Sequence, residues 1–594
     1  MDARFLLQGL KPVIDYGSRQ PLYVSVLALF LKSFGVSFAV GRLVPLFSTL
    51  ASGALLFLIG KNIFSWRAGF IAAALSLFLP LTLIWSATVK TEPMTILLSC
   101  LAVYVFFKAL DVKKAQWIWI ALAGIFSACA FYVRQPALYM PIAIFLYIIS
   151  SPSKWQKKFI HLLAFVGGYA AIVLIAFILY SEMSVQDFLF SQLNPLYLVW
   201  NRLLHIFGAV PEQYQIVDSS GFRILGQDID YTITAWRQAI FLSLFVLTAA
   251  YFAFAFIKKQ AIEKKDHFMF LLFWFGCALL LYLYQTLNKS FYTQYFTEML
   301  PPLFLLTGLW LADKFRQVSL RKFVFYLCAM AAVFAAAFVV QRLFWRLYPG
   351  IGGYLILSAF VVSGFTGIVF SLPGKRVLTL MFGNMIIMAG IHFSFSMLNV
   401  EATFTGIAGI IAFYYLSFAF LEKSGFREKL TDRIQLLTFF FAFLITAFFS
   451  GHVITFGYEA VWTPDTVYKV NHVLQKHADP GDHILSGGMI WTFESGSSPY
   501  QGVSHPTQFL KKEIDDFKTE FRANRPEYII LDGYTERKFT RYWTFIHEEM
   551  EKYYSEIARI EGSQYPVRIY SFSTFPHKVP SYFSRLSGSL ELKK

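Results

Sequence analysis

Charged residues are scarce in this chain of 594 residues: Asp, Glu, Lys and Arg make up 15% of it, against 57% hydrophobic residues. A soluble protein carries roughly 25% charged residues and could not bury this much apolar surface. The apolar residues fall in long runs separated by short charged clusters, which is typical of helices that span a bilayer. The composition therefore excludes a soluble globular protein and predicts a multi-pass membrane protein.

Cysteine is also rare, and we expect no cleavable signal peptide. The four cysteines all lie in apolar runs and form no CxxC pair, so the sequence predicts neither a zinc site nor a disulfide framework. We interpret them as small buried hydrophobic residues. The first twenty residues, MDARFLLQGLKPVIDYGSRQ, are polar and mixed, unlike a secretory signal.

The excess of Lys and Arg over Asp and Glu is explained by the topology of a membrane protein. The formal net charge is +16, which in a soluble chain would hint at nucleic acid. Here the positive charge gathers in short loops between apolar runs, where it sets the orientation of the spans. We therefore expect no nucleic-acid partner.

The hydropathy pattern predicts fourteen membrane-spanning helices. An apolar segment of fifteen residues, Pro21 to Gly35, precedes them and is short for a span, so we expect a helix that lies in the membrane interface. The predicted spans cover about residues 37–59, 68–88, 94–110, 116–133, 137–150, 159–180, 237–257, 267–287, 300–313, 322–341, 352–372, 376–398, 404–421 and 434–451.

The distribution of Lys and Arg sets the orientation. When residues 60–67 are placed in the cytoplasm, the inside loops carry 21 Lys and Arg and the outside connections carry 7. This bias has the direction of the positive-inside rule. We therefore expect a protein of the cell inner (cytoplasmic) membrane, with residues 1–36, the loop 181–236 and the region 452–594 outside, around a membrane domain of residues 37–451.

The region after residue 452 has the composition of a soluble domain. Three segments read as strands, HILSGGMIW, EYIILDGY and VRIYSFS, and helical patterns precede and separate them at about 465–478, 506–524 and 539–558. This alternation predicts a small α/β layer domain with parallel strand pairing.

Polar residues at the outer ends of spans are the candidates for chemistry, because the positive-inside rule does not account for them. Glu92 lies in the short outer turn Lys90–Pro93, where it either binds a divalent cation or begins a helix. Arg134 lies between two apolar runs, where it either binds a phosphate or extends to the membrane surface. We expect Glu92 and Arg134 to lie close together at the mouth of one cavity.

Two further stretches on the outer side carry candidates. Asp15 and Arg19 lie just before the predicted interfacial helix, either facing a polar cavity or in a solvated turn. Tyr292, Tyr295 and Glu298 follow a three-residue spacing, which fits one wall of a cavity or an aromatic belt at the membrane surface. Carboxylates, an arginine and a divalent metal together suit a lipid-linked phosphate substrate.

These residues occur in an order that resembles the GT-C superfamily of membrane glycosyltransferases. The resemblance is greatest to the branch of protein O-mannosyltransferases and the aminoarabinose transferase of lipid A, and it covers about the first 310 residues. It rests on several weak motifs: Gly9-x-x-Pro12-x-x-Asp15, Arg19-Gln20-Pro21-Leu22, GVSFAVGR from Gly35, Lys90-Thr91-Glu92-Pro93, GIFSACAFYVRQPA from Gly124, and the Tyr292–Pro302 stretch.

The resemblance implies an all-α polytopic GT-C fold and transfer of a sugar from a polyprenyl-phosphate donor to a lipid, glycan or protein acceptor on the outer face. It implies inversion at the anomeric carbon and a divalent cation such as Mg²⁺ or Mn²⁺. Glu92 would be the second acidic residue of the site and a metal ligand, and Arg134 would lie near the lipid phosphate. Arg19 and Gln20 match charged and polar positions at the entry of the interfacial helix.

One feature of the family has no match. Its first transmembrane helix and first acidic motif lie upstream of the position that Gly9 matches. We expect these to precede Met1, or Asp2 or Asp15 to supply the carboxylate. A chain without that carboxylate is expected to be inactive.

Two other functions stay open. One is a transporter or flippase of lipid-linked sugars, although internal repeats are not evident. The other is an enzyme like an O-antigen polymerase or ligase. That class has catalytic groups in a large outer loop, and the loop 181–236 contains Arg202, His205, Arg223, Asp228 and Asp230.

Overall fold

The chain divides into two compact units, which are described separately. One contains the residues up to Gly41 and those from Phe456, and the other contains the helices between Arg42 and Thr455. The computed structural model describes residues 2–10, 21–78, 82, 85–112, 115–179, 188, 265–287, 297–314, 351–369, 372–398, 402–423, 437, 441, 464–479, 481–488, 490–502, 513–533, 535–561 and 566–573.

The second unit is helical, and every predicted span that falls on described residues is a helix. The predicted spans 237–257, 322–341 and 434–451 lie outside the described residues, apart from Leu437 and Phe441. The helices are α3 (Phe38–Ile63), α4 (Trp66–Phe78), α6 (Glu92–Asp111), α7 (Gln116–Val133), α8 (Tyr139–Ser150), α9 (Trp155–Leu179), α13 (Lys265–Leu287), α15 (Leu300–Lys314), α17 (Ile351–Val369), α18 (Gly374–Met397) and α19 (Ala402–Lys423). Two short 3₁₀ helices, η1 (Gln135–Leu138) and η3 (Thr297–Met299), precede α8 and α15.

Five of the described helices are long and apolar enough to cross a membrane: α3, α6, α7, α9 and α18. On α9, large apolar side chains such as Trp155, Phe159 and Leu163 are more than half exposed, as is expected of a surface that faces lipid. The protein is therefore a multi-pass membrane protein. Helices such as α4, α8 and α15 are shorter than a usual span, so the number of crossings stays a prediction.

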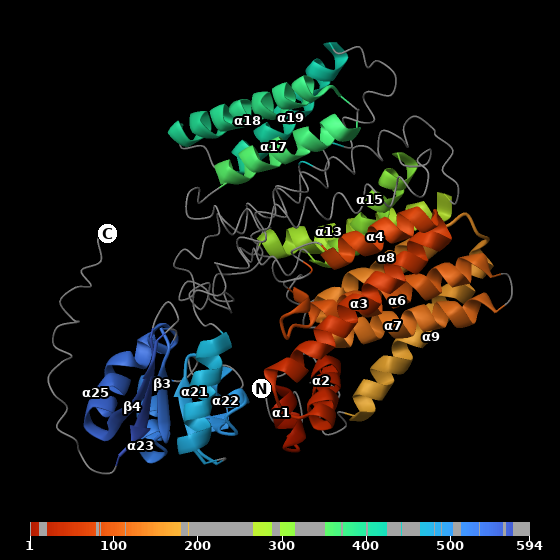
Figure 1. Cartoon of the computed structure of the whole chain (residues 1–594). Coiled ribbons are helices and arrows are strands. Elements are labelled where there is room, and N and C mark those ends of the chain that lie inside the picture. The colour runs from red at the N-terminus through yellow and green to blue at the C-terminus, as the bar shows by residue number, and fades with distance from the viewer. Residues whose placement is uncertain are drawn as a thin grey trace, which may run out of the picture. The chain divides into compact units, whose positions relative to one another are not determined.

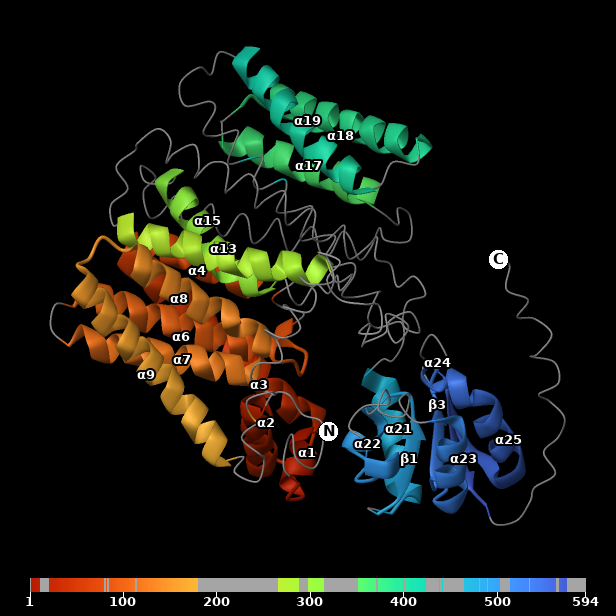
Figure 2. The same cartoon turned by 180° about the vertical axis from the view of Figure 1, so that it is seen from behind.

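Glycine residues bring several of these helices into close contact. Helices α6, α7 and α9 pack in sequence, and α17, α18 and α19 form another packed group (Figure 1 and, from behind, Figure 2). Where α7 crosses α9, a Cβ on Gly124 would lie 2.2 Å from the carbonyl oxygen of Phe165, and one on Gly168 would lie 2.0 Å from that of Ala121. Small residues at such crossings let the backbones approach within van der Waals contact, which drives helix association in lipid.

The C-terminal domain is a five-stranded sheet between helices. The strand order is β2-β1-β3-β5-β4, and helix α21 covers one face while α23 and α25 cover the other. Alternate residues of each strand enter the two cores: Ile484 and Ile530 pack on the side of α21, and Leu485 and Ile529 on the other. The elements are α21 (Pro464–His477), β1 (His483–Ser486), α22 (Ile490–Phe493), β2 (Ser498–Pro499), η4 (Tyr500–Gly502), α23 (Ile514–Ala523), β3 (Tyr528–Leu531), α24 (Thr535–Lys538), η6 (Thr540–Tyr542), α25 (Trp543–Tyr553), β4 (Tyr554–Ile560) and β5 (Val567–Phe572).

The predicted parallel pairing of this domain is wrong for half of the sheet. Strands β2, β1 and β3 are parallel, but β5 runs antiparallel to both β3 and β4. Strand β4 lies partly in the segment 539–558 that was predicted to be helical, because the residues YSEIARI include helix formers. The short connection from β4 to β5 then forces a hairpin, since parallel strands need a crossover of roughly a dozen residues or more.

The N-terminal segment belongs to the same unit as this sheet domain. Its helices are α1 (Asp2–Leu7) and α2 (Pro21–Phe34), and α2 coincides with the predicted interfacial helix. The Arg4 guanidinium donates hydrogen bonds to the backbone carbonyls of Thr492, in α22, and of Gly496, beyond the end of that helix. The backbone N–H of Phe38 donates to the Glu494 carboxylate at 2.6 Å. These contacts join the two ends of the chain into one folded unit.

Candidate functional site

Glu92 begins helix α6 and is buried at the same time. Pro93 follows it in the first turn, where a proline is favoured because its fixed backbone angle suits a helix start. The Glu92 side chain is only 3% exposed, and the Thr91 hydroxyl donates a hydrogen bond to its carboxylate at 3.4 Å. The two interpretations of the sequence are therefore compatible: Glu92 starts the helix and also carries a buried carboxylate.

Arg134 lies at the junction of α7 and η1, in extended backbone that ends α7. It is 4% exposed, its Nη1 donates to the Glu298 carboxylate, and its Nε lies 3.7 Å from Oε1 of Glu92. The expected proximity of Glu92 and Arg134 is confirmed. The alternative that Arg134 extends to the membrane surface is wrong, because the buried carboxylates hold the guanidinium inside the protein.

Glu298 completes the cluster from η3, ahead of the predicted span that begins at Leu300. Its side chain is 2% exposed. Burial raises the pKa of Glu298 to about 7, and the charge of Glu92 adds to this effect, while Arg134 opposes it. At neutral pH Glu298 can therefore be either protonated or ionised, depending on what charge lies beside it.

The cluster of Glu92, Arg134 and Glu298 carries two acidic groups for one base. With all three groups ionised its formal charge is −1, and with Glu298 protonated it is zero. Charged groups inside a membrane protein are costly unless paired, so a buried cluster of three indicates function more strongly than stability.

The cluster of Glu92, Arg134 and Glu298 offers part of a ligand set for a divalent cation. Carboxylate oxygens of Glu92 and Glu298 are the hard ligands that Mg²⁺ and Mn²⁺ prefer, and Mg²⁺ often uses only one or two carboxylates together with substrate phosphates. Among the described residues no three His, Cys, Asp or Glu side chains come together. Arg134 also lies beside both carboxylates, so an ion would share them with the guanidinium.

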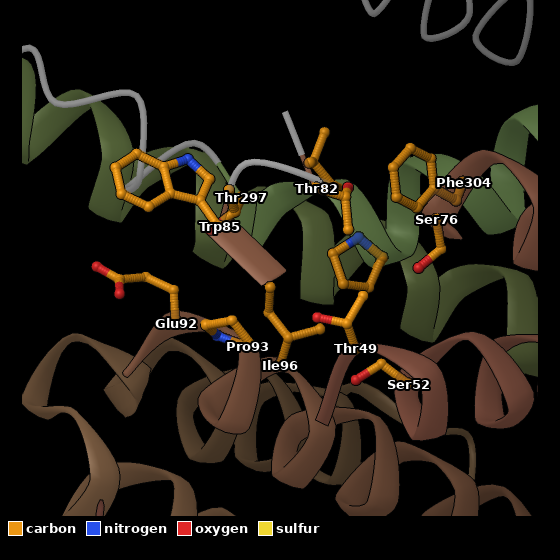
Figure 3. Close-up of a pocket in the computed structure, with 12 residues that line it drawn as sticks. Thr49, Ser52, Ser76, Thr82, Trp85, Glu92, Pro93, Ile96, Thr297 and Phe304 are labelled. Carbon is orange, nitrogen blue, oxygen red and sulfur yellow. The ribbon is translucent and has the colours of Figure 1, made fainter. Parts of the chain in front are cut away.

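A cavity lies next to Glu92 within this helical unit. Figure 3 shows Thr49, Ser52 and Ser76 along one side of it and Trp85 and Glu92 along the other. Its lining residues come from α3, α4, α6, η3, α15 and the segment between α4 and α6: Thr49, Ser52, Ser76, Thr82, Trp85, Glu92, Pro93, Ile96, Thr297, Leu300, Pro301 and Phe304.

Several residues predicted for the site lie outside the described part of the chain: Asp15, Arg19, Gln20, Tyr292 and Tyr295. The same holds for the charged residues of the loop 181–236. Their roles stay predictions.

Apart from Glu92, the residues that line the cavity were not predicted as site residues from the sequence. A signal was present in α3, where Thr49 and Ser52 are three residues apart and so share one face of an otherwise apolar helix. Nothing in the sequence could place Trp85 opposite them, because that contact depends on how α3, α4 and α6 pack.

Part of the chain is similar to a known protein family. Residues 18–180, which include Glu92 and Arg134, match the family described as dolichyl-phosphate-mannose-protein mannosyltransferase. No curated protein sequence gives a significant match. The expected resemblance is confirmed by the family match over residues 18–180, and one solved structure shows a similar fold over most of the chain.

The similar solved structures include two of ArnT from Cupriavidus metallidurans. The structure in the apo state is 12% identical in sequence, covers 96% of this chain and 91% of that chain, and has a TM-score of 0.50. The structure bound to undecaprenyl phosphate is 12% identical, covers 96% of this chain and 92% of that chain, and has a TM-score of 0.46. At this identity the likeness is one of fold.

Proposed function

We propose that the protein is a glycosyltransferase that moves a sugar from a polyprenyl-phosphate donor to an acceptor at the outer face of the membrane. The observation that carries the proposal is the buried cluster of Arg134 with Glu92 and Glu298 beside a cavity. Glu92 and Arg134 lie within the residues that match a family of lipid-linked mannosyltransferases. A buried arginine and two carboxylates are groups suited to a charged leaving group and a hydroxyl acceptor.

Arg134 would hold the donor phosphate. A guanidinium offers two parallel N–H donors to phosphate oxygens, which a lysine cannot do. An approaching phosphate would favour the protonated form of Glu298, because burial has already raised its pKa to about 7. Protonation of Glu298 removes the negative charge that competes with the phosphate for Arg134. Arg134 can then exchange its ion pair with Glu298 for an ion pair with the donor phosphate.

The transfer breaks the bond between the sugar's anomeric carbon and the phosphate oxygen, and forms a bond from the acceptor oxygen to that carbon. The phosphate keeps the electron pair of the broken bond, and the acceptor hydroxyl gives its proton to a carboxylate. Glu92 lies beside Arg134, so it would orient the acceptor or take this proton. Asp15 stays the other candidate for that role, as the family resemblance implies.

A divalent cation at Glu92 also stays a proposal. Mg²⁺ or Mn²⁺ there would neutralise charge that develops on the phosphate. The ion would be held by Glu92 together with oxygen atoms of the donor.

The test is a transfer assay with a carboxylate variant. Purified protein in liposomes would receive undecaprenyl-phosphoryl sugar with a radioactive label and cell-envelope extract as acceptor. We expect Glu92→Gln to lower both labelled product and released undecaprenyl phosphate by about 100-fold or more, which begins at the lower end of the range for general acid–base catalysis. The control is Glu422→Gln, which changes an exposed carboxylate at the end of α19 and should transfer normally. Normal transfer by Glu92→Gln in folded protein would contradict the proposal.

We further propose that the sheet domain lies outside the cytoplasm. The 21-to-7 bias of Lys and Arg supports this orientation. The contacts of Arg4 with the sheet domain also place the N-terminal segment and the tail in one unit, which is compatible with their predicted location on one side.

A reporter that is active only in the cytoplasm tests the orientation. The reporter should be inactive when it is fused after Lys594. It should be active when it is fused after Lys423, which lies in the predicted inside loop 422–433. The reverse pattern would overturn the orientation and the outer location of the site.

A further inference from the structure

A buried hydrogen bond joins helix α6 to the first residue of α8. The hydroxyl oxygens of Ser99 and Tyr139 lie 3.1 Å apart, although the two residues are 40 positions apart in the sequence. Ser99 is fully buried, and Tyr139 is 2% exposed. Polar groups inside an apolar helix bundle find their partners within the protein, so this bond attaches α8 to α6 at a defined point.

Ser99 lies on the same face of α6 as Glu92. The two residues are seven positions apart, which is close to two full turns of a helix and a rise of about 10 Å. About two turns further along both helices, the rings of Phe106 and Tyr147 meet edge to face, with their centroids 5.6 Å apart. Helices α6 and α8 therefore run side by side in the same direction, and Glu92 lies at the end where both begin.

A single short turn separates Tyr139 from Arg134. Arg134 is in extended backbone at the end of α7, and η1 (Gln135–Leu138), with Pro136 in its first turn, leads directly into α8. The backbone N–H of Ala137 donates to the carbonyl of Arg134 at 3.0 Å, which closes this turn on Arg134 itself. Proline has a fixed backbone angle, and a hydrogen-bonded turn has little freedom. The position of Tyr139 is therefore transmitted to the backbone of Arg134.

Arg134 needs this support because its direct partner is the group that the donor replaces. Glu298 accepts a hydrogen bond from Arg134, and in the proposed function this ion pair is exchanged for one with the donor phosphate. The contact of Arg134 with Glu92 is 3.7 Å long, beyond hydrogen-bond distance. A guanidinium binds phosphate through two parallel bonds, which demands a fixed orientation. The bond between Ser99 and Tyr139 is not part of the exchange and stays in place.

We propose that Tyr139 is a positioning residue, which holds Arg134 beside Glu92 through its hydrogen bond with Ser99. The inference rests on the proposed function and adds to it a residue outside the charged cluster. Tyr139 acts through Arg134 and makes no contact with the reacting atoms. Loss of its hydroxyl should therefore weaken the binding of a lipid phosphate as far as Arg134 contributes to that binding, and no further.

The test measures the affinity for undecaprenyl phosphate of the purified full-length protein in nanodiscs. Tyr139→Phe keeps the ring and removes the hydroxyl, and Ser99→Ala removes the other half of the bond. Each should weaken the affinity by about threefold to tenfold, as expected for one hydrogen bond between membrane helices. The double variant should bind as weakly as either single variant, because both changes remove the same bond. Wild-type affinity in folded Tyr139→Phe and Ser99→Ala would overturn the proposal.

Two controls distinguish positioning from a general loss of stability. Ser363→Ala removes a buried hydrogen bond of 2.8 Å that Asn384 donates from α18 to α17, so it should lower the melting temperature and leave the affinity unchanged. Tyr139→Phe in the Arg134→Ala background should cause no further loss of affinity, because the group that Tyr139 positions is absent. An equal further loss in that background would mean that Tyr139 acts on the whole bundle, and the proposal would be wrong.

The Arg134→Ala variant alone separates this inference from the proposed function. If it binds undecaprenyl phosphate as tightly as the wild type does, Arg134 does not hold the phosphate. The proposed function then loses its phosphate site, and this inference fails with it. If Arg134→Ala binds more weakly while Tyr139→Phe and Ser99→Ala bind normally, this inference alone fails.

Discussion

Replacing Arg134 with alanine should lower sugar transfer by about 100-fold or more. The change removes charge-assisted hydrogen bonds of roughly 1.5–3 kcal/mol each, and each 1.4 kcal/mol is about tenfold in rate. It also leaves Glu92 and Glu298 buried beside each other without their cation, so we expect a lower melting temperature in detergent. The measurement is transfer rate per folded protein, with the folded fraction taken from the size-exclusion peak. Normal transfer by folded Arg134→Ala would remove Arg134 from the site.

Two companion variants separate the charge of the cluster from its geometry. Arg134→Lys keeps the charge and loses the fork, so transfer should fall by about tenfold, the loss of one charge-assisted bond. Glu298→Gln keeps an oxygen that can accept from Arg134 and removes the acidic proton, so transfer at pH 7 should stay within about threefold of wild type.

The dependence of the transfer rate on pH tests the role of Glu298. Its pKa is raised to about 7, so Glu298 is protonated below that pH and ionised above it. Ionised Glu298 competes with the donor phosphate for Arg134, so wild-type transfer at low donor should decline as the pH rises through 7. Glu298→Gln cannot ionise and should not show this decline. A profile with the same decline in both proteins would assign the titration to another group.

Adding one methyl group to Gly168 should destabilise the membrane domain by about 3 kcal/mol, the upper part of the usual range for an overpacked site. The new Cβ would lie 2.0 Å from the carbonyl oxygen of Ala121, a backbone atom that cannot move without shifting α7. The gain in helix propensity from Gly to Ala, about 1 kcal/mol, is too small to compensate. We expect Gly168→Ala to unfold at a clearly lower temperature than wild type in detergent.

The neighbouring glycine is the control. A Cβ on Gly167 meets no atom within 4 Å, so Gly167→Ala has the same propensity gain without the clash. It should be as stable as wild type or slightly more so. Equal melting temperatures for the two variants would mean that α7 and α9 are not packed as closely as described.

The sequence by itself determined the class of this protein and the approximate positions of the long apolar helices that the structure describes. Helices that span a bilayer need long apolar runs, and the loops between them follow the positive-inside rule. Hydropathy and the distribution of Lys and Arg therefore give two independent indications of where these helices lie. Glu92 and Arg134 could be selected because the positive-inside rule does not account for charge at the predicted outer ends of spans. The sheet domain shows the limit: strand segments were found from local pattern, but β4 was predicted as helix and the antiparallel pairing was missed.

Only the tertiary structure decided which of the selected residues meet and where a ligand fits. Glu298 reaches Arg134 across 164 positions of sequence, and that contact depends on how η3 packs beside α6 and α13. The cavity needs α3, α4, α6 and α15 together, and α15 lies far from the other three in the sequence. Hydropathy records how far a side chain prefers to leave water, whereas a cavity is a property of packed neighbours, so it becomes visible only in the fold.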